Sequence, residues 1–202
     1  MEQYLYSKIC NTLTSFEKKR KKESCLLHSH RENVLITFLF PQQLYTELPG
    51  HVFTLNSNFD EVKSESYDAL ILPGGRFTEL LSINGKALSI VKEFAEAGKP
   101  IATTCHSQLM LISAGLLKGK KCFAFPSLKP IMEFAGGNWW ARLAENPLGI
   151  DITACVMDGN ILSTIGWPAH AEYLEILLRS IGAKITRTRD NAVLFLCGVS
   201  LN

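Results

Sequence analysis

From residue 67 onward, short apolar runs alternate with longer segments in which apolar residues recur at helical spacing. The run "YDALIL" stops at "PGG", which is typical of a buried strand that enters a loop, and "KPIATTC" predicts another strand. Between them, "NGKALSIVKEFAEAG" places Leu88, Val91 and Phe94 on one face of a predicted helix, and Gly98 takes the usual C-cap position. Strands alternating with helices predict an α/β fold: a three-layer α-β-α sandwich around a mostly parallel sheet.

The remaining segments of this region complete the predicted domain, residues 33–186. "NVLITFLF" and "KCFAFPS" predict strands, and "ITACVMDGNILSTIG" predicts a hairpin around Asp158-Gly159. "HSQLMLISAGLLKG" predicts a buried helix, and "PAHAEYLEILLRSIG" an amphipathic one. "LKPIMEFAGGNWW" predicts a helix or turn with a Gly-Gly break.

Both ends of the chain depart from this pattern. Residues 1–32 form an irregular basic segment with five consecutive basic residues, Lys18 to Lys22. A charged surface is the favoured interpretation, and a nuclear address is the alternative. Residues 187–202 include "NAVLFLCGVSLN", a strand pattern that fits either an edge strand or the opening of a truncated second repeat.

Composition narrows the function classes. The 202 residues are 47% apolar with a net charge of +2, which suits one ordinary domain and gives no general argument for nucleic acid or membrane partners. No apolar run is long enough to span a bilayer, and the first residues lack the pattern of a signal peptide. The six cysteines contain no CxxC pair, which argues against a zinc ribbon or a disulfide scaffold. We therefore expect a cytoplasmic protein with reduced thiols and no metal.

The stretch "TTCHSQ" has the pattern of a nucleophile elbow. A strand that turns abruptly into a helix at Cys105 would present the thiol at the carboxyl edge of the sheet, where doubly wound folds bind ligands. The helix N-terminus favours thiolate over thiol, and His106 adds a proton carrier. The "PGGR" loop ends the preceding strand, so Gly74 and Gly75 are candidates for an oxyanion and substrate-binding site.

At family level, "YDALILPGGR", "GKPIATTCHSQLMLISAGLLKGKKCFAFPS" and "GGNWW" resemble the PfpI family (the DJ-one group) of the class I glutamine-amidotransferase-like superfamily. The resemblance covers residues 43–185 and is closest to plant tandem-domain members, some of which are glutathione-independent glyoxalases. It implies a flavodoxin-like fold, Cys105 as nucleophile, and the N–H groups of Gly75 and His106 as oxyanion donors. It also implies a lactate-forming lyase acting on methylglyoxal-type 2-oxoaldehydes, a stress-response role, a homo-oligomer and no cofactor.

The sequence also departs from the family. A glutamate on a segment similar to "GDYxEDYE" is absent, and Glu47 is not a matched position. Loss of that general acid–base group predicts a rate lower by on the order of 10²–10⁴. Ser107 replaces the usual glycine after the Cys-His pair, so its side chain either crowds the pocket or caps the helix.

Other residues leave two alternatives open. His170 and Glu172, in "WPAHAEY", resemble the His and Glu of amidotransferase triads. They are therefore accessory candidates for a cysteine-dependent amidase or peptidase-like hydrolase. For His170, capping of the last helix is the favoured interpretation. Trp139 and Trp140 fit a pocket wall or, at least as well, packing in the core or at a trimer interface. The missing glutamate raises the second alternative, an inactive homologue that acts as a redox sensor or a binding protein.

Overall fold

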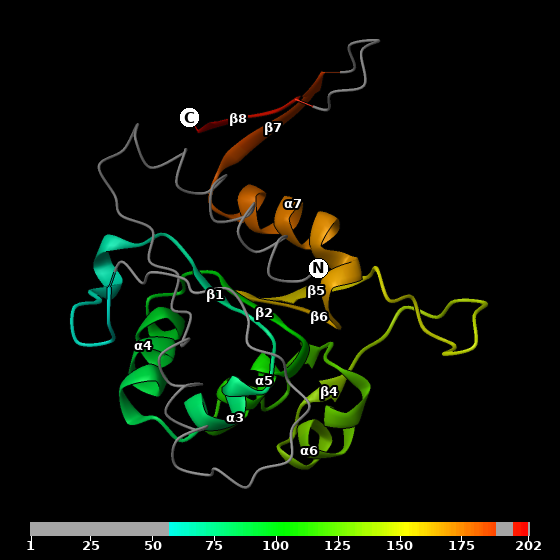
Figure 1. Cartoon of the computed structure of the whole chain (residues 1–202), viewed down its shortest axis with the longest axis horizontal. Coiled ribbons are helices and arrows are strands. Elements are labelled where there is room, and N and C mark those ends of the chain that lie inside the picture. The colour runs from blue at the N-terminus through cyan, green and yellow to red at the C-terminus, as the bar shows by residue number, and fades with distance from the viewer. Residues whose placement is uncertain (1–56, 189–195, 202) are drawn as a thin grey trace, which may run out of the picture.

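The computed structural model describes residues 57–188 and 196–201, and a four-stranded sheet lies at its centre (Figure 1). Its strands, in spatial order, are β1 (Leu70–Leu72), β2 (Ile101–Thr104), β6 (Ile161–Thr164) and β5 (Cys155–Asp158). The first three are mutually parallel, and β5 joins β6 as an antiparallel hairpin. The mostly parallel sheet and the hairpin at Asp158-Gly159 are therefore confirmed.

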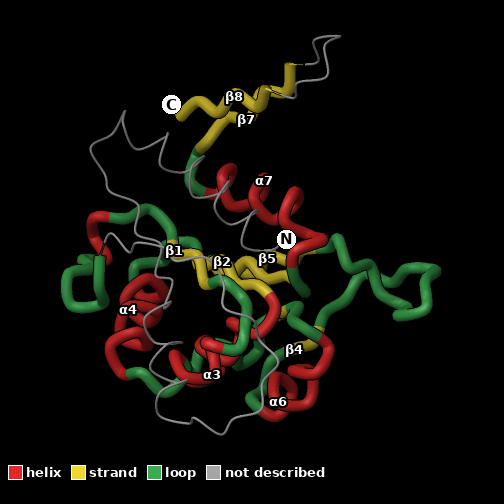
Figure 2. The backbone as a smooth tube through the Cα atoms, in the orientation of Figure 1, coloured by secondary structure: helices red, strands yellow, loops and turns green. Residues whose placement is uncertain are grey.

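Helices lie on both faces of this sheet (Figures 1 and 2). They are α3 (Phe77–Leu81), α4 (Gly85–Glu96), α5 (Gln108–Ser113), α6 (Lys129–Phe134) and α7 (His170–Ser180). The first three follow β1 and β2 on one side, and α7 follows β6 on the other. This arrangement confirms the α/β sandwich that the alternating pattern predicts.

Successive residues of the central strands supply the two cores. Ile101 packs with α4 and α5 in the larger core, whereas its neighbour Ala102 packs with α7. In β6 the same alternation separates Ile161 from Leu162. Because side chains of a strand point to opposite faces in turn, a sheet covered on both sides buries every residue of its central strands, as in β2 and β6.

Two predicted elements are shorter than the sequence suggests. Only Lys121–Cys122 of "KCFAFPS" is a strand (β3), and it pairs with the equally short β4 (Asn138–Trp139). The helix predicted from His106 to Gly119 is limited to α5, because Gly115 adopts a φ of 75° that ends the helical path. The predicted strand Asn33–Phe40 lies outside the described residues.

The last described strands form a separate ladder. β7 (Ala183–Thr188) pairs antiparallel with β8 (Leu196–Leu201), and both lie beyond α7 in Figure 1. The predicted boundary between residues 186 and 187 falls within β7, and the second-repeat interpretation remains a prediction. Among the helices that the structure describes, none is long and apolar enough to cross a bilayer.

Candidate active site

Three parallel strands end at the same edge of the sheet. β1 leads into Gly74 and Gly75, β2 leads into Cys105, and β6 leads through a short turn into His170 at the start of α7. The register aligns Leu72 with Thr103 and Thr104 with Thr164, so these strands finish almost in step. The topology thus brings the predicted site residues to one edge, as expected for a doubly wound sheet.

Cys105 lies at a sharp strand-to-helix turn. Its φ is 57°, and it is the one non-glycine residue with a positive φ in the described ranges. That conformation costs on the order of 1–2 kcal/mol for a residue with a side chain. The side chain is partly exposed, whereas Thr104 before it and Ser107 after it are buried. The predicted elbow is therefore present in the backbone.

The buried Ser107 hydroxyl stabilises this turn through two hydrogen bonds with Thr104. It accepts the Thr104 N–H at 2.8 Å and donates to the Thr104 carbonyl oxygen, also at 2.8 Å. Of the two interpretations of Ser107, the structure supports the one in which the hydroxyl serves the turn. These two hydrogen bonds hold the end of β2 in the geometry from which Cys105 turns outward.

The imidazole of His106 lies beside the Cys105 thiol. Its Nδ1 is 3.1 Å from the Cys105 Sγ, within hydrogen-bond distance for a sulfur atom, and a ring protonated on Nε2 is the tautomer that can accept the thiol proton there. The ring stacks on Phe125 with centroids 5.1 Å apart, and the Phe125 N–H donates to the Cys105 carbonyl oxygen at 3.4 Å. Phe125 therefore contacts both residues of the Cys-His pair, His106 through its ring and Cys105 through its backbone N–H.

Burial and two opposing charges set the protonation of His106. Burial lowers the pKa of His106 below its ordinary value, the charge of Glu79 raises the pKa, and that of Arg76 lowers it. Both charged residues come from the segment that begins with the "PGGR" loop. The net effect is a neutral ring near pH 7, which is the form that can accept the thiol proton.

The Gly74–Gly75 loop lies directly against the elbow. A Cβ added to Gly74 would lie 2.6 Å from the Cys105 Cβ and 3.0 Å from the Thr104 carbonyl oxygen. Gly75 adopts a φ of 117°, which side chains disfavour. Glycine at position 74 thus lets the loop backbone approach Cys105, and glycine at position 75 lets the loop adopt its positive φ. The role of their N–H groups as oxyanion donors remains a prediction.

The accessory candidates have their own contacts at this edge. His170 is buried, its ring centroid is 6.0 Å from that of Tyr173, and burial lowers its pKa. Glu172 accepts a hydrogen bond from Arg142 at 3.3 Å, and Arg142 also binds Asp151 at 2.7 Å. Glu172 therefore anchors the loop that extends from the body in Figure 2, and the accessory catalytic role of both residues remains a prediction.

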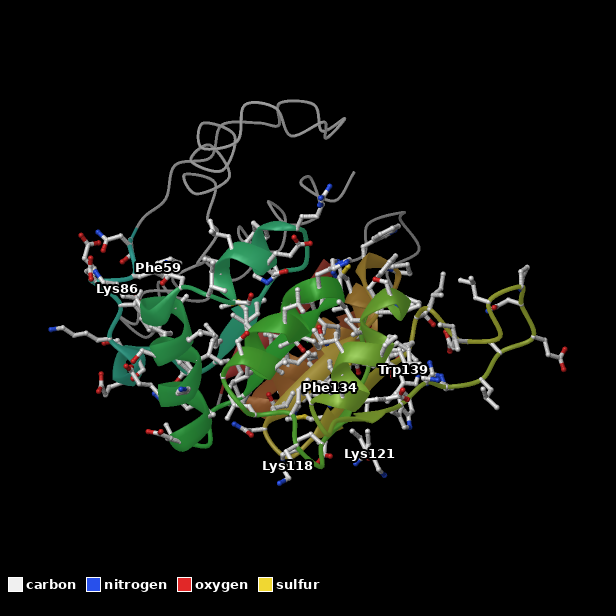
Figure 3. The ribbon with its side chains drawn as sticks, turned by 90° about the horizontal axis from the view of Figure 1, so that it is seen from below. Phe59, Lys86, Lys118, Lys121, Phe134 and Trp139 are labelled. Carbon is white, nitrogen blue, oxygen red and sulfur yellow. The ribbon has the colours of Figure 1, made fainter. Side chains whose placement is uncertain are left out.

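The two tryptophans pack around a buried ring. Trp139 and Trp140 meet Phe123 edge-on, with centroids 5.5 and 6.0 Å apart, on the segment where Figure 3 labels Trp139. Interior packing is the interpretation that these contacts favour.

Within the described residues, no group of three or more histidine, cysteine or acidic side chains is arranged to hold a metal ion.

Comparison with known proteins identifies the family. The profile of the DJ-1/PfpI family matches residues 29–180, which include the elbow, the "PGGR" loop and α7. The chain belongs to the DJ-1/PfpI family. This membership confirms the resemblance that the Cys-His elbow and the glycine loop indicate.

Family members from plants and archaea are similar over different lengths. DJ-1 protein homolog F of Arabidopsis thaliana is 46% identical over 184 residues, covering 89% of this chain and 44% of the relative. DJ-1 protein homolog E of the same plant is 49% identical over 159 residues, or 77% of this chain and 40% of the relative. A protein named deglycase from Pyrococcus horikoshii is 41% identical over 100 residues, or 50% of this chain and 60% of the relative. The chain thus spans less than half the length of the plant relatives.

Solved structures of family members share the fold. A two-domain protein from Anabaena variabilis with DJ-1/ThiJ/PfpI-like and ferritin-like domains aligns with a TM-score of 0.55 at 27% identity, covering 61% of this chain and 32% of that one. DJ-1 of Schizosaccharomyces pombe aligns with a TM-score of 0.50 at 24% identity, covering 63% and 65%. The family fold therefore extends over the described sandwich.

Sequence reasoning missed four residues of the site. Phe125 stacks on His106, Glu79 and Arg76 act on its charge, and Thr78 donates to backbone of the loop and the elbow. Arg76 was visible as the last letter of "PGGR", although nothing in the pattern linked it to His106. The other three lie in ordinary helical or turn segments, and only the tertiary structure brings them to the elbow.

Proposed function

We propose that this DJ-1/PfpI family member acts on small reactive carbonyls, namely 2-oxoaldehydes such as methylglyoxal, through covalent attack by Cys105. The observation that carries the proposal is the thiol at a strained elbow, 3.1 Å from His106 Nδ1 and pressed against Gly74. Relatives from archaea that are named deglycases support a carbonyl chemistry. Such a pair of nucleophile and base beside close backbone is the arrangement that acyl and carbonyl chemistry requires.

The proposed reaction begins with transfer of the thiol proton to the neutral ring of His106. The Cys105 sulfur then bonds to the aldehyde carbon, and the carbonyl electron pair moves to oxygen. N–H groups of Gly75 and His106 stabilise that oxyanion until it takes a proton and becomes a thiohemiacetal. The proton on the former aldehyde carbon then moves to the neighbouring carbon, and the hydroxyl proton of the thiohemiacetal moves to the former ketone oxygen, so the adduct becomes the thioester of a 2-hydroxy acid.

Water completes the reaction. It attacks the thioester carbon, the carbon–sulfur bond breaks, and the thiol is restored as the 2-hydroxy acid leaves. The net change is addition of one water to the oxoaldehyde, so neither glutathione nor an external oxidant enters the balance. The imidazole of His106 is close enough to carry each proton, because its Nδ1 already contacts the sulfur. The family glutamate that is absent from the sequence predicts slow turnover.

The test is formation of D-lactate from methylglyoxal by the full chain and its variants. We expect Cys105→Ala to abolish turnover and Cys105→Ser to retain little of it. Cys155→Ala is the matched control, because Cys155 is a buried thiol whose Sγ contacts the Ala169 carbonyl oxygen. Equal rates for the unmodified chain and Cys105→Ala would refute the proposal.

A second candidate is a cysteine-dependent amidase or peptidase-like hydrolase in which His170 assists Cys105. His170 follows β6, the strand beside β2, through a short turn, and this position favours the candidate. Hydrolysis of a fluorogenic amide that is unchanged in His170→Ala would exclude the arrangement. The remaining alternative, a redox sensor, predicts an acidic Cys105 thiol, which the pH dependence of Cys105 alkylation measures.

The oligomeric state is a separate proposal. We expect a homo-oligomer, as the family resemblance implies. Light scattering after size-exclusion chromatography gives the mass in solution, and a mass near the 22.5 kDa of one chain would contradict it.

A further inference from the structure

The hydroxyl of Thr78 lies between the two backbone segments that build the nucleophile site. Thr78 belongs to α3 and is fully buried. Its Oγ1 is 2.7 Å from the Gly75 carbonyl oxygen and 3.2 Å from the His106 carbonyl oxygen. Gly75 belongs to the loop after β1, and His106 to the elbow after β2. One side chain therefore contacts both halves of the site.

The two carbonyl groups compete for a single proton. A hydroxyl carries one hydrogen, so it donates mainly to Gly75 at the shorter distance and shares the bond with His106. Two carbonyl oxygens that converge on one point repel each other unless a donor lies between them. Loss of such a buried donor costs on the order of 1–3 kcal/mol. The Thr78 N–H also reaches the Gly75 oxygen, but only at 3.4 Å.

The loop needs such a restraint because glycine gives it little of its own. Gly74 and Gly75 are consecutive, and glycine has access to more backbone conformations than any other residue. Nevertheless, the loop must keep its backbone within contact distance of Cys105. Stabilisation of an oxyanion depends on donor positions to within fractions of an ångström, and a shift of about 1 Å costs on the order of 10²-fold in rate.

We propose that Thr78 is a positioning residue: its hydroxyl locks the Gly74–Gly75 loop to the Cys105–His106 elbow and so holds the backbone donors at the sulfur. The catalytic consequence rests on the proposed carbonyl chemistry, whereas the locking itself does not. A purely local role is the competing explanation, because threonine commonly bonds the carbonyl three residues before it in a helix. That local role accounts for the contact with Gly75 but not for the contact with His106.

Two substitutions separate the hydroxyl from the shape of the side chain. Thr78→Val keeps the volume and removes the donor, whereas Thr78→Ser keeps the donor and removes a methyl group. Ser82→Ala is the matched control, because Ser82 is the C-cap of α3 and its hydroxyl bonds the Glu79 carbonyl oxygen three residues earlier, at 2.6 Å. Should Thr78→Val not fold, Thr78→Ala takes its place as the variant without the hydroxyl.

Amide hydrogen exchange tests the locking without any need for turnover. We expect Thr78→Val to raise the exchange rates at the Gly75 loop and at the His106 elbow together, by about tenfold or more. Thr78→Ser and Ser82→Ala should leave the elbow within about twofold of the unmodified chain. Faster exchange at the loop alone, with an unchanged elbow, would overturn the proposal and leave the local role.

Kinetics test the catalytic consequence. With methylglyoxal, Thr78→Val should lower kcat about tenfold or more and leave KM within about threefold, since the oxyanion forms only after binding. Alkylation of Cys105 by iodoacetamide should change less than twofold, because it develops no such charge. A kcat of Thr78→Ser near that of the unmodified chain supports the positioning role. A kcat of Thr78→Val equal to that of the unmodified chain overturns it. An unmodified chain that forms no lactate would refute the proposed function, while the exchange result would still decide the locking.

Discussion

The α-carbon of Gly74 lies so close to Cys105 that an added Cβ would stand 2.6 Å from the Cys105 Cβ and 3.5 Å from its Sγ. The same atom would lie 3.0 Å from the Thr104 carbonyl oxygen, which belongs to a strand and cannot move aside easily. The loop can therefore lie this close to Cys105 only because Gly74 has no side chain. The relationship connects two segments about thirty residues apart in the sequence.

Gly74→Ala adds only one methyl group, but it should disrupt the site strongly. Relief of the contact moves either the loop or the elbow, and such overpacking costs about 1–3 kcal/mol of unfolding free energy. We expect loss of turnover together with a lower melting temperature. Gly85→Ala is the control, because a Cβ at Gly85, the first residue of α4, meets nothing within 4 Å. Equal melting temperatures and activities of the two variants would contradict the packing argument.

The described thiols should differ sharply in reactivity. Burial raises the pKa of Cys122 and of Cys155 to about 12, so both stay protonated at pH 8. Cys105 is partly exposed and contacts His106. Brief treatment with iodoacetamide at pH 8, followed by peptide mass spectrometry, should find Cys105 labelled well before the other two. In guanidinium all three should label at similar rates, and early labelling of Cys122 in the native chain would contradict the expectation.

The titration of His106 should respond to its two charged neighbours in opposite directions. Glu79 raises the pKa of His106, so Glu79→Gln should lower it further. Arg76 lowers the same pKa, so Arg76→Gln should raise it. NMR titration of the imidazole resonances, assigned with a His106→Gln variant, measures both changes. Shifts of the same sign in the two variants would show that the charges do not act directly on this ring.

Stability should fall as the pH drops through the range of histidine. Burial lowers the pKa of His170 below its ordinary value of 6.5, so the unfolded chain binds a proton that the folded chain does not. The free energy of unfolding therefore decreases as pH falls below about 6.5, until the folded state is also protonated. Urea unfolding at pH 7.5 and 5.5 should show a smaller decrease in His170→Gln than in the unmodified chain. The lowered pKa of His106 changes the pH dependence of the unfolding free energy in the same direction, so His106→Gln should also show a smaller decrease.

The sequence predicted those features of the site that depend on local order. Cys105 follows an apolar strand and precedes a helix, and the glycine loop ends the neighbouring strand, so both could be placed at the carboxyl edge. The predicted length of α5 was wrong, although Gly115 marked its end. There, the apolar residues after Gly115 extended the helical pattern without continuing the helix.

Contacts between segments distant in the sequence could not be predicted from the hydrophobic pattern. Thr78 reaches His106 across 28 positions, and the stacking of Phe125 on His106 depends on how the segment after β3 folds over the elbow. Helical periodicity marks Thr78 only as one position of a short helix. Its hydrogen bond to the His106 carbonyl oxygen follows from the way α3 packs against the turn after β2, which no local signal encodes.

The positive φ of Cys105 has a consequence for the stability of the whole chain. Glycine adopts that conformation without the penalty of about 1–2 kcal/mol that a side chain brings. Cys105→Gly should therefore destroy the nucleophile and yet be at least as stable toward denaturant as the unmodified chain. Foldability alone would favour glycine at this position, so the cost of placing a cysteine at this φ is one that the proposed nucleophilic role would account for.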